Sequence, residues 1–143
     1  MANAATSAGH VEVGPGAFLG GLSAVHQFAR VGAGAMIGGA SMVAQDVIPF
    51  GLTHGNRAKI MGLNVVGLRR RGLSREGLSA LKGAYRILFH SGLSLAEAIV
   101  KIEQGSRSPE VDVFLSFLRG TSPRGLCRPA AKTDGDDSAE SLA

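Results

Sequence analysis

Aliphatic residues recur every six positions from Val13 to Ile48, and the segment divides into six consecutive hexads without an insertion. The first places of the hexads are Val13, Leu19, Val25, Val31, Ile37 and Val43. Five of the six fifth places hold Ala or Ser. A period of six matches neither the 3.6-residue repeat of a helix nor the two-residue repeat of a strand. It is typical of a parallel β-helix, in which three hexads close one coil of about 18 residues and the aliphatic side chains stack inward.

The second place of the hexads is Gly or Ala except in the third hexad, where it is His26. Because we expect small residues there to serve tight corners, a histidine at this place is a candidate for substrate contact. A purely structural histidine remains the alternative for His26. For His10, which precedes the hexads, a simple surface or interface histidine is the alternative to a role in binding.

The hexad pattern breaks between Asp46 and Gly51, where Pro49 takes an aliphatic place. We expect the coil to end there and the segment from Gly51 to Asn56 to form a loop. The segment Asn64–Gly72 predicts a short helical turn that ends at its glycine.

Three further helices are predicted from their caps and their apolar spacing. Ser74 is the expected N-cap of the first helix, Ser94 opens the second as part of a Ser-x-x-Glu capping box, and Ser108-Pro109 begins the third. The residues predicted to be buried are Leu78, Leu81, Tyr85 and Leu88, then Leu95, Ile99 and Ile102, then Val113, Phe114, Phe117 and Leu118.

These patterns predict three regions. Residues 1–51 form the hexapeptide-repeat coil, residues 52–128 form a helical C-terminal domain, and residues 129–143 form a disordered tail without apolar periodicity. Residues 1–12 continue the repeat and show no amphipathic cap for the exposed coil edge. We therefore expect the chain to begin inside an architecture that is normally longer.

Composition and charge narrow the function classes. The single cysteine, Cys127, excludes an internal disulfide framework and a cysteine-based zinc cluster, and it has no nearby His that would favour a nucleophile. Residues 1–128 carry fourteen Lys and Arg against seven Asp and Glu. No stretch approaches the roughly 18 apolar residues that cross a membrane, so we expect a cytoplasmic protein.

Several motifs together resemble a known family. The sequence reads GGLSAVHQF, VGAGAMIGG, VAQDVIPFG, HGN, GLNVVGLRRRGLSRE and finally TSPRGL. This combination, which spans Ala2 to Arg128, is similar to the C-terminal half of the bacterial UDP-N-acetylglucosamine O-acyltransferases of lipid A biosynthesis. The resemblance implies a left-handed parallel β-helix of about two coils followed by a three-helix C-terminal domain. It also implies a homotrimer with active sites between subunits.

The family reaction implied by the resemblance is the transfer of a 3-hydroxyacyl chain from acyl carrier protein to the 3-hydroxyl of UDP-N-acetylglucosamine, without a cofactor. The substrate-binding residues that it implies are His10, His26, Gln27, Asn64, Arg70 and Arg71. Gly39 matches the position that sets acyl length, and a glycine there leaves the groove open. The family's general-base histidine would lie upstream of Met1, so no catalytic residue is expected within this chain.

Two residues depart from the family pattern. Val66 stands where the family often has Glu, which removes a polar contact to the nucleotide. Arg57 replaces a histidine that is common in the acyl region. Independently of the resemblance, arginines at the end of a short helix offer the planar donors and the fixed charge that a diphosphate requires.

Other functions remain open at this point. A catalytically inactive fragment, or a module that only trimerises or binds a nucleotide sugar or acyl carrier protein, would retain the same motifs. Zinc is disfavoured because the spacing of the four histidines does not match the trimeric β-helix carbonic anhydrases. Nucleic-acid binding is disfavoured because no aromatic residues alternate with the Arg69–Arg71 run. These arginines could also be a solvated face, or they could attract the acidic acyl carrier protein.

Overall fold

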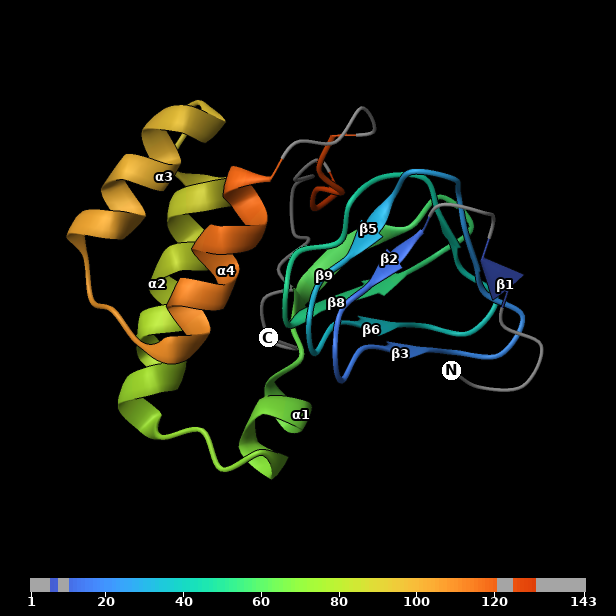
Figure 1. The fold of residues 1–143 in the computed structure, drawn as a ribbon, viewed down its shortest axis with the longest axis horizontal. Coiled ribbons are helices and arrows are strands. Elements are labelled where there is room, and N and C mark those ends of the chain that lie inside the picture. Colours follow the sequence, from blue (N-terminus) through green and yellow to red (C-terminus); the bar gives the residue numbers. More distant parts are fainter. Residues whose placement is uncertain (1–5, 8–10, 121–124, 131–143) are drawn as a thin grey trace. The chain divides into compact units, whose positions relative to one another are not determined.

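The computed structural model describes residues 6–7, 11–120 and 125–130. Contacts between residues divide the chain into two compact units (Figure 1). The coil unit comprises residues 1–65 and 122–143, and the helical unit comprises residues 66–121. The sequence placed the boundary after Gly51, whereas the segment up to Val65 belongs to the coil unit.

The coil unit is built from short strands that stack in parallel. The strands are β1 (Thr6–Ser7), β2 (Glu12–Val13), β3 (Phe18–Leu19), β4 (Ala24–Val25), β5 (Arg30–Val31), β6 (Met36–Ile37), β7 (Met42–Val43), β8 (Gly51–His54) and β9 (Lys59–Leu63). They form three sheets in the orders β1-β4-β7, β2-β5 and β3-β6-β8-β9. Phe18 pairs with Met36 and Ala24 with Met42, so partner residues are 18 positions apart. This register is that of a parallel β-helix with three hexads in each coil.

The interior of the coil unit follows the hexad pattern. The first-place residues from Leu19 onward are buried, as are the fifth-place residues from Ser23 onward. Val13, by contrast, is exposed. The prediction that the aliphatic places stack inward is therefore confirmed for the layers from Leu19 onward.

The turns lie later in the hexad than the sequence predicted. The fourth places of the first five hexads have positive φ angles, which are 73° at Gly16, 59° at Leu22, 69° at Phe28, 66° at Gly34 and 59° at Ala40. The second place is small for another reason, which is that the backbone of the next layer lies directly over it. A Cβ atom would be 2.5 Å from the Ala33 nitrogen at Gly14 and 2.3 Å from the Pro49 nitrogen at Gly32.

The prediction that the coil ends at Gly51 is wrong. Strand β8 replaces the expected loop and pairs in parallel with β6, and β9 then returns antiparallel to β8. The coil does become shorter at this level. Val25 pairs with Val43, 18 residues on, but Val31 pairs with Val47, 16 residues on. Three residues in the upper layer therefore span a corner that takes five in the layer below.

Residues 125–130, here called the closing segment, return to the coil unit. Leu126 forms a parallel bridge with Asp46, and Pro129 forms one with Ile60. The disordered tail predicted from Pro129 thus begins with a residue that pairs with the coil. The remainder of that prediction, residues 131–143, lies outside the described residues.

The helical unit contains the four described helices apart from the first residue of α1. These are α1 (Val65–Arg70), α2 (Arg75–His90), α3 (Leu95–Gln104) and α4 (Pro109–Arg119). The predicted N-caps Ser74, Ser94 and Ser108 are confirmed, because each side chain accepts a backbone N–H of its own first turn. Helices α2, α3 and α4 pack against one another (Figure 1). None of the described helices is long and apolar enough to cross a membrane.

Two residues predicted to be buried in the helical unit are exposed. Leu95 is 38% exposed and Val113 is 40% exposed. Ala98 and Leu115 are buried on the same two helices. The packed face of each helix is therefore rotated from the face that the largest apolar residues suggested.

Candidate functional site

The turn between β4 and β5 carries two of the predicted site residues. His26 is half-buried and Gln27 is exposed. The His26 N–H donates to the Val43 carbonyl at 2.8 Å, and the Ala29 N–H donates to the His26 carbonyl at 3.1 Å. Phe28 completes the turn in the left-handed region and is 50% exposed. A non-glycine residue in this conformation is strained, and Leu22 and Ala40 share it at the same hexad place.

An ion pair that the sequence did not predict lies beside this turn. The Asp46 carboxylate accepts from the Arg30 backbone N–H, from Nε and from Nη2, each at 2.9 Å. Asp46 is only 1% exposed, and the Arg30 side chain is mostly buried. The break in the hexad pattern at Asp46 was the available signal, but it did not reveal which residue the carboxylate contacts.

Gly39 lies at a different corner, in the turn between β6 and β7. It is exposed, and a Cβ atom there would lie 3.2 Å from the Gly21 carbonyl oxygen of the layer below. Exposed apolar residues come from the strands and turns on both sides of this corner. They are Phe18, Leu22, Met36 and Met42, of which Leu22 is 73% exposed. This apolar corner has the chemistry to contact a hydrocarbon chain.

Asn64 lies at the third corner, after the end of β9. Its backbone N–H donates to the Phe50 carbonyl at 2.6 Å. Its side-chain amide is 3.5 Å from the carbonyl oxygen of Gly34, which is in the turn between β5 and β6. The amide is therefore held against the coil in the position where the chain leaves the coil unit.

Arg70 and Arg71 belong to the helical unit. Both are exposed, Arg70 as the last residue of α1 and Arg71 directly after it. The Arg71 N–H donates to the carbonyls of Gly67 and Leu68, and Gly72 with φ 84° ends the turn. The backbone is fixed and both arginines are exposed. Guanidinium groups at such a position have the charge and the planar donors that suit phosphate oxygens.

The described part of one chain does not gather the predicted site residues at one place. His26 with Gln27, Gly39 and Asn64 lie at the three different corners of the coil unit. His10 lies outside the described residues. Val66 and Arg57, which depart from the family pattern, are both exposed.

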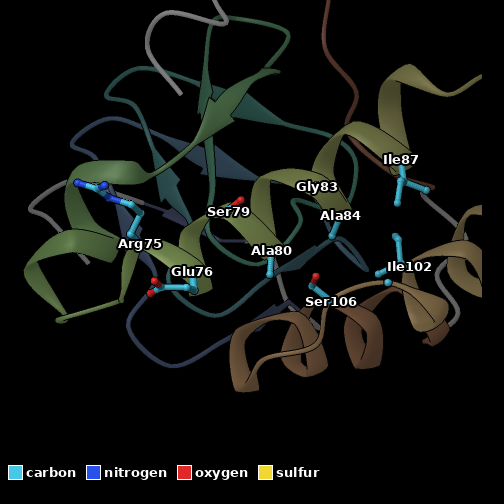
Figure 2. A pocket seen from close by; sticks show the side chains of 10 residues that line it. Arg75, Glu76, Ser79, Ala80, Gly83, Ala84, Ile87, Ile102 and Ser106 are labelled. Carbon is cyan, nitrogen blue, oxygen red and sulfur yellow. The ribbon is translucent and has the colours of Figure 1, made fainter.

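A cavity of about 490 Å³ lies within the helical unit (Figure 2). Arg75 and Glu76 of α2 stand at one end, while Ile87 of α2 and Ile102 of α3 point toward one another at the other end. Small residues of α2, including Ala80 and Gly83, line the wall between the two ends. None of the predicted site residues lines this cavity.

Cys127 of the closing segment is buried and donates its Sγ–H to the Ala58 carbonyl at 3.0 Å. Burial raises the pKa of its thiol to about 11, so the thiolate required of a nucleophile is scarce at neutral pH. Among residues 6–7, 11–120 and 125–130, no three His, Cys, Asp or Glu side chains are grouped as a metal site would require.

Comparison with protein families gives a match for residues 46–127. The matching family model is described as Udp N-acetylglucosamine O-acyltransferase, domain 2. The match includes Asp46, the segment from Asn64 to Arg71 and the whole helical unit.

Curated relatives extend the similarity toward the N-terminus. The chain is 46% identical over 133 residues to acyl-(acyl-carrier-protein)–UDP-N-acetylglucosamine O-acyltransferase of Burkholderia orbicola, and 47% identical to that of Burkholderia ambifaria. Each alignment covers 90% of this chain and 50% of the relative. The chain therefore spans about half the length of these relatives.

Solved structures agree with these comparisons. The chain is similar to LpxA from Acinetobacter baumannii with a TM-score of 0.84 and 37% identity, covering 88% of this chain and 49% of that one. It is also similar to UDP-N-acetylglucosamine acyltransferase from Campylobacter jejuni, with a TM-score of 0.79 and 41% identity, covering 91% and 50%.

Proposed function

The chain belongs to the UDP-N-acetylglucosamine O-acyltransferase family, and from this premise we propose that it acts in 3-hydroxyacyl transfer from acyl carrier protein to the 3-hydroxyl of UDP-N-acetylglucosamine. This transfer is the first step of lipid A biosynthesis. The observation that carries the proposal is the family match over residues 46–127, which includes Asn64 and both exposed arginines. The relatives named above are acyltransferases, which favours this function over a module that only trimerises or binds.

In the proposed complex, Arg70 and Arg71 hold the diphosphate of the nucleotide sugar. Paired guanidinium donors match phosphate oxygens in charge and geometry. His26, Gln27 and Asn64 supply hydrogen-bonding groups to the sugar and the base, and His10 is proposed to join them. In this proposal, these side chains bind and orient the acceptor. Orientation alone contributes strongly to the rate of a two-substrate reaction.

The acyl chain is proposed to lie along the apolar corner that contains Gly39. Leu22 and Met42 offer exposed apolar surface there, and Gly39 adds no side chain to limit the groove. This open corner supports a preference for a longer acyl chain. The excess of Lys and Arg outside the last fifteen residues supports an electrostatic attraction to acidic acyl carrier protein.

A homotrimer would explain why the predicted residues lie at three separate corners. Corners of different copies can meet at an interface and complete a site that one chain leaves divided. The exposed apolar residues around Gly39 support such an interface, because isolated soluble chains seldom expose large apolar patches.

We further propose that the coils are left-handed, that the chain contains about two complete coils, and that α2, α3 and α4 form a three-helix domain. We also propose a cytoplasmic location, where both substrates are soluble.

Isothermal titration of the purified chain with UDP-N-acetylglucosamine tests the proposal. Arg70→Ala and Arg71→Ala should each weaken binding about ten- to a hundredfold, because each removes charge-assisted hydrogen bonds to phosphate. Arg69→Ala is the matched control, since Arg69 is exposed in the same helix and should leave the affinity nearly unchanged. Absence of binding by the unaltered chain, or equal weakening by all three variants, would contradict the proposed site.

Acyl transfer is tested separately with 3-hydroxyacyl carrier protein and labelled UDP-N-acetylglucosamine. Formation of the O-acylated nucleotide sugar, dependent on Arg70, would establish the reaction. Binding without product would restrict this chain to recognition of the acceptor.

A further inference from the structure

The turn that carries His26 and Gln27 is held by an unusual set of hydrogen bonds. In β3 and β4, the first residue of the strand donates its N–H to the layer above, 17 positions on. Phe18 donates to the Ala35 carbonyl at 2.8 Å, and Ala24 donates to the Ser41 carbonyl at 2.9 Å. The corresponding acceptor for Arg30, the first residue of β5, would be the carbonyl of Val47.

That acceptor is not available to Arg30. Because the upper layer is two residues shorter at this corner, the Val47 carbonyl accepts from Gly32 instead, at 2.8 Å. The Asp46 carboxylate takes its place and accepts the Arg30 N–H at 2.9 Å. At this corner a side-chain carboxylate accepts the N–H of the first strand residue, where a backbone carbonyl does so in β3 and β4.

Asp46 is itself fixed on several sides. Its second carboxylate oxygen accepts from the Arg30 guanidinium, so its buried charge is paired. Its backbone N–H donates to the Gly125 carbonyl at 2.8 Å, and its carbonyl accepts from the Cys127 N–H at 2.7 Å. The closing segment thereby fixes the residue that accepts the N–H at the end of the turn.

The shortened corner also explains why a histidine fits at this place. At Gly14, Gly20 and Gly32 a Cβ atom would lie within 2.6 Å of the backbone of the next layer. His26 occupies the same hexad place beneath the shortened corner, where fewer residues of the next layer must pass over it. The corner that admits His26 is thus the corner that requires Asp46.

We propose that Asp46 is a positioning residue for the acceptor site. It holds the strained turn at its end, while the bond from His26 to the Val43 carbonyl holds its start. His26 and Gln27 then keep one orientation toward the nucleotide sugar. This inference rests on the proposed function, but Asp46 does not contact the substrate, because its carboxylate is buried and occupied by Arg30.

The test uses Asp46→Asn, which has nearly the same shape but places an amide N–H against the Arg30 guanidinium. Titration of the 143-residue chain with UDP-N-acetylglucosamine, well below the melting temperature of each variant, should show about tenfold weaker binding. Without ligand, the NMR amide signals of Gln27 and Phe28 and the imidazole signals of His26 should shift. Adding Arg30→Gln supplies a carbonyl acceptor for the new amide and should restore most of the affinity and of the NMR signals.

Ile37→Ala is the control for a purely structural effect, because Ile37 is buried in β6 and does not contact Asp46 in the ladder. It should lower stability and leave both the affinity and the turn signals unchanged. Wild-type affinity and unmoved turn signals in Asp46→Asn would overturn the inference, as would an equal loss of affinity in Ile37→Ala. If the unaltered chain does not bind UDP-N-acetylglucosamine, the proposed function fails, and the turn signals alone decide whether Asp46 positions the turn.

Discussion

The coil unit and the helical unit are stabilised by contacts of different range along the chain. In the coil unit, the pairing between neighbouring layers joins residues 16 or 18 positions apart. In the helical unit, the caps and the first-turn bonds join residues three or four positions apart, as in the capping box of Ser94 and Glu97. A residue in the coil therefore depends on what lies in the next layer, whereas a residue near a helix terminus depends mainly on its own helix.

The same comparison explains where the proposed binding groups occur. Turns at the coil corners repeat at fixed spacing, so a change in one layer alters the space beside the layer below. The shortened corner at Asp46 gives His26 its room in this way. The helical unit provides Arg70 and Arg71 through a short helix that ends at Gly72, which is a local feature.

The sharpest test of the comparison is the same substitution in both units. Gly32→Ala should lower the free energy of unfolding of the coil unit by about 3 kcal/mol, since the new Cβ would lie 2.3 Å from the Pro49 nitrogen. Gly83→Ala in α2 should instead stabilise the helical unit by up to about 1 kcal/mol, because nothing lies within 4 Å and alanine favours helix. Native-state hydrogen exchange reports on each unit separately. If the free energy of unfolding changed in the same direction in both units, the proposed difference between them would be wrong.

The closing segment should make the coil unit sensitive to alkaline pH. Burial raises the pKa of Cys127 to about 11 from an ordinary value of 9.0, so the folded state favours the neutral thiol. The contribution of the neutral thiol to the free energy of unfolding is fully present below about pH 9. It falls by about 1.4 kcal/mol per pH unit as the pH rises toward 11. The difference in unfolding free energy between the unaltered chain and Cys127→Ala, measured across this range, should show the loss.

Alkylation provides the matching kinetic measurement. Iodoacetamide at about pH 8 should modify the denatured chain much faster than the native chain, because the native thiol is buried and protonated. Equal rates would show that the closing segment does not protect Cys127.

The buried hydroxyl of Thr53 should lower the stability of the coil unit. Among the described residues, the hydroxyl oxygen of Thr53 is buried without a hydrogen-bond partner. Thr53→Val keeps the shape and removes the unpaired hydroxyl, and should stabilise the coil unit by about 1 kcal/mol in urea denaturation. Thr53→Ser, which retains the hydroxyl and loses a methyl group, should destabilise it. A loss of stability in Thr53→Val would indicate that the hydroxyl has a role in the fold.

The most local of the predicted effects concerns the capping box of α3. Ser94→Ala should lower the stability of the helical unit by about 1 kcal/mol, because the Glu97 N–H loses its side-chain acceptor. Hydrogen bonds from the Ser94 side chain and backbone also lower the pKa of Glu97. The stabilisation that these bonds give to the folded state is present above pH 4.5, the ordinary pKa of a glutamate, and is lost as the pH falls below it.

Comparing Ser94→Ala with the unaltered chain at neutral and acidic pH should therefore show a smaller difference in acid. Ser116→Ala, at an exposed position within α4, is the control and should have little effect at either pH. An unchanged difference in acid would mean that Glu97 does not contribute to the cap.

Much of the fold and part of the candidate site could be predicted from the sequence because their signals are periodic or local. The hexads predicted the stacked coil and its buried aliphatic places, and the serine caps predicted where α2, α3 and α4 begin. The sequence also indicated His26 as an exception among small residues. These signals suffice because a coil repeats one contact many times and a helix cap involves only neighbouring residues.

The tertiary structure decided the features that depend on register between layers and on which helix faces meet. The hexad break at Asp46 did not reveal that the coil continues through β8, that one corner loses two residues, or that Asp46 contacts Arg30. Apolar spacing likewise did not show that Leu95 and Val113 would remain exposed. The sequence by itself determined the repeating layer and the residues at which the helices begin. Only three-dimensional packing determined which residues lie above each corner of the coil. The reason is that contacts between layers join residues with no fixed spacing once the repeat is interrupted.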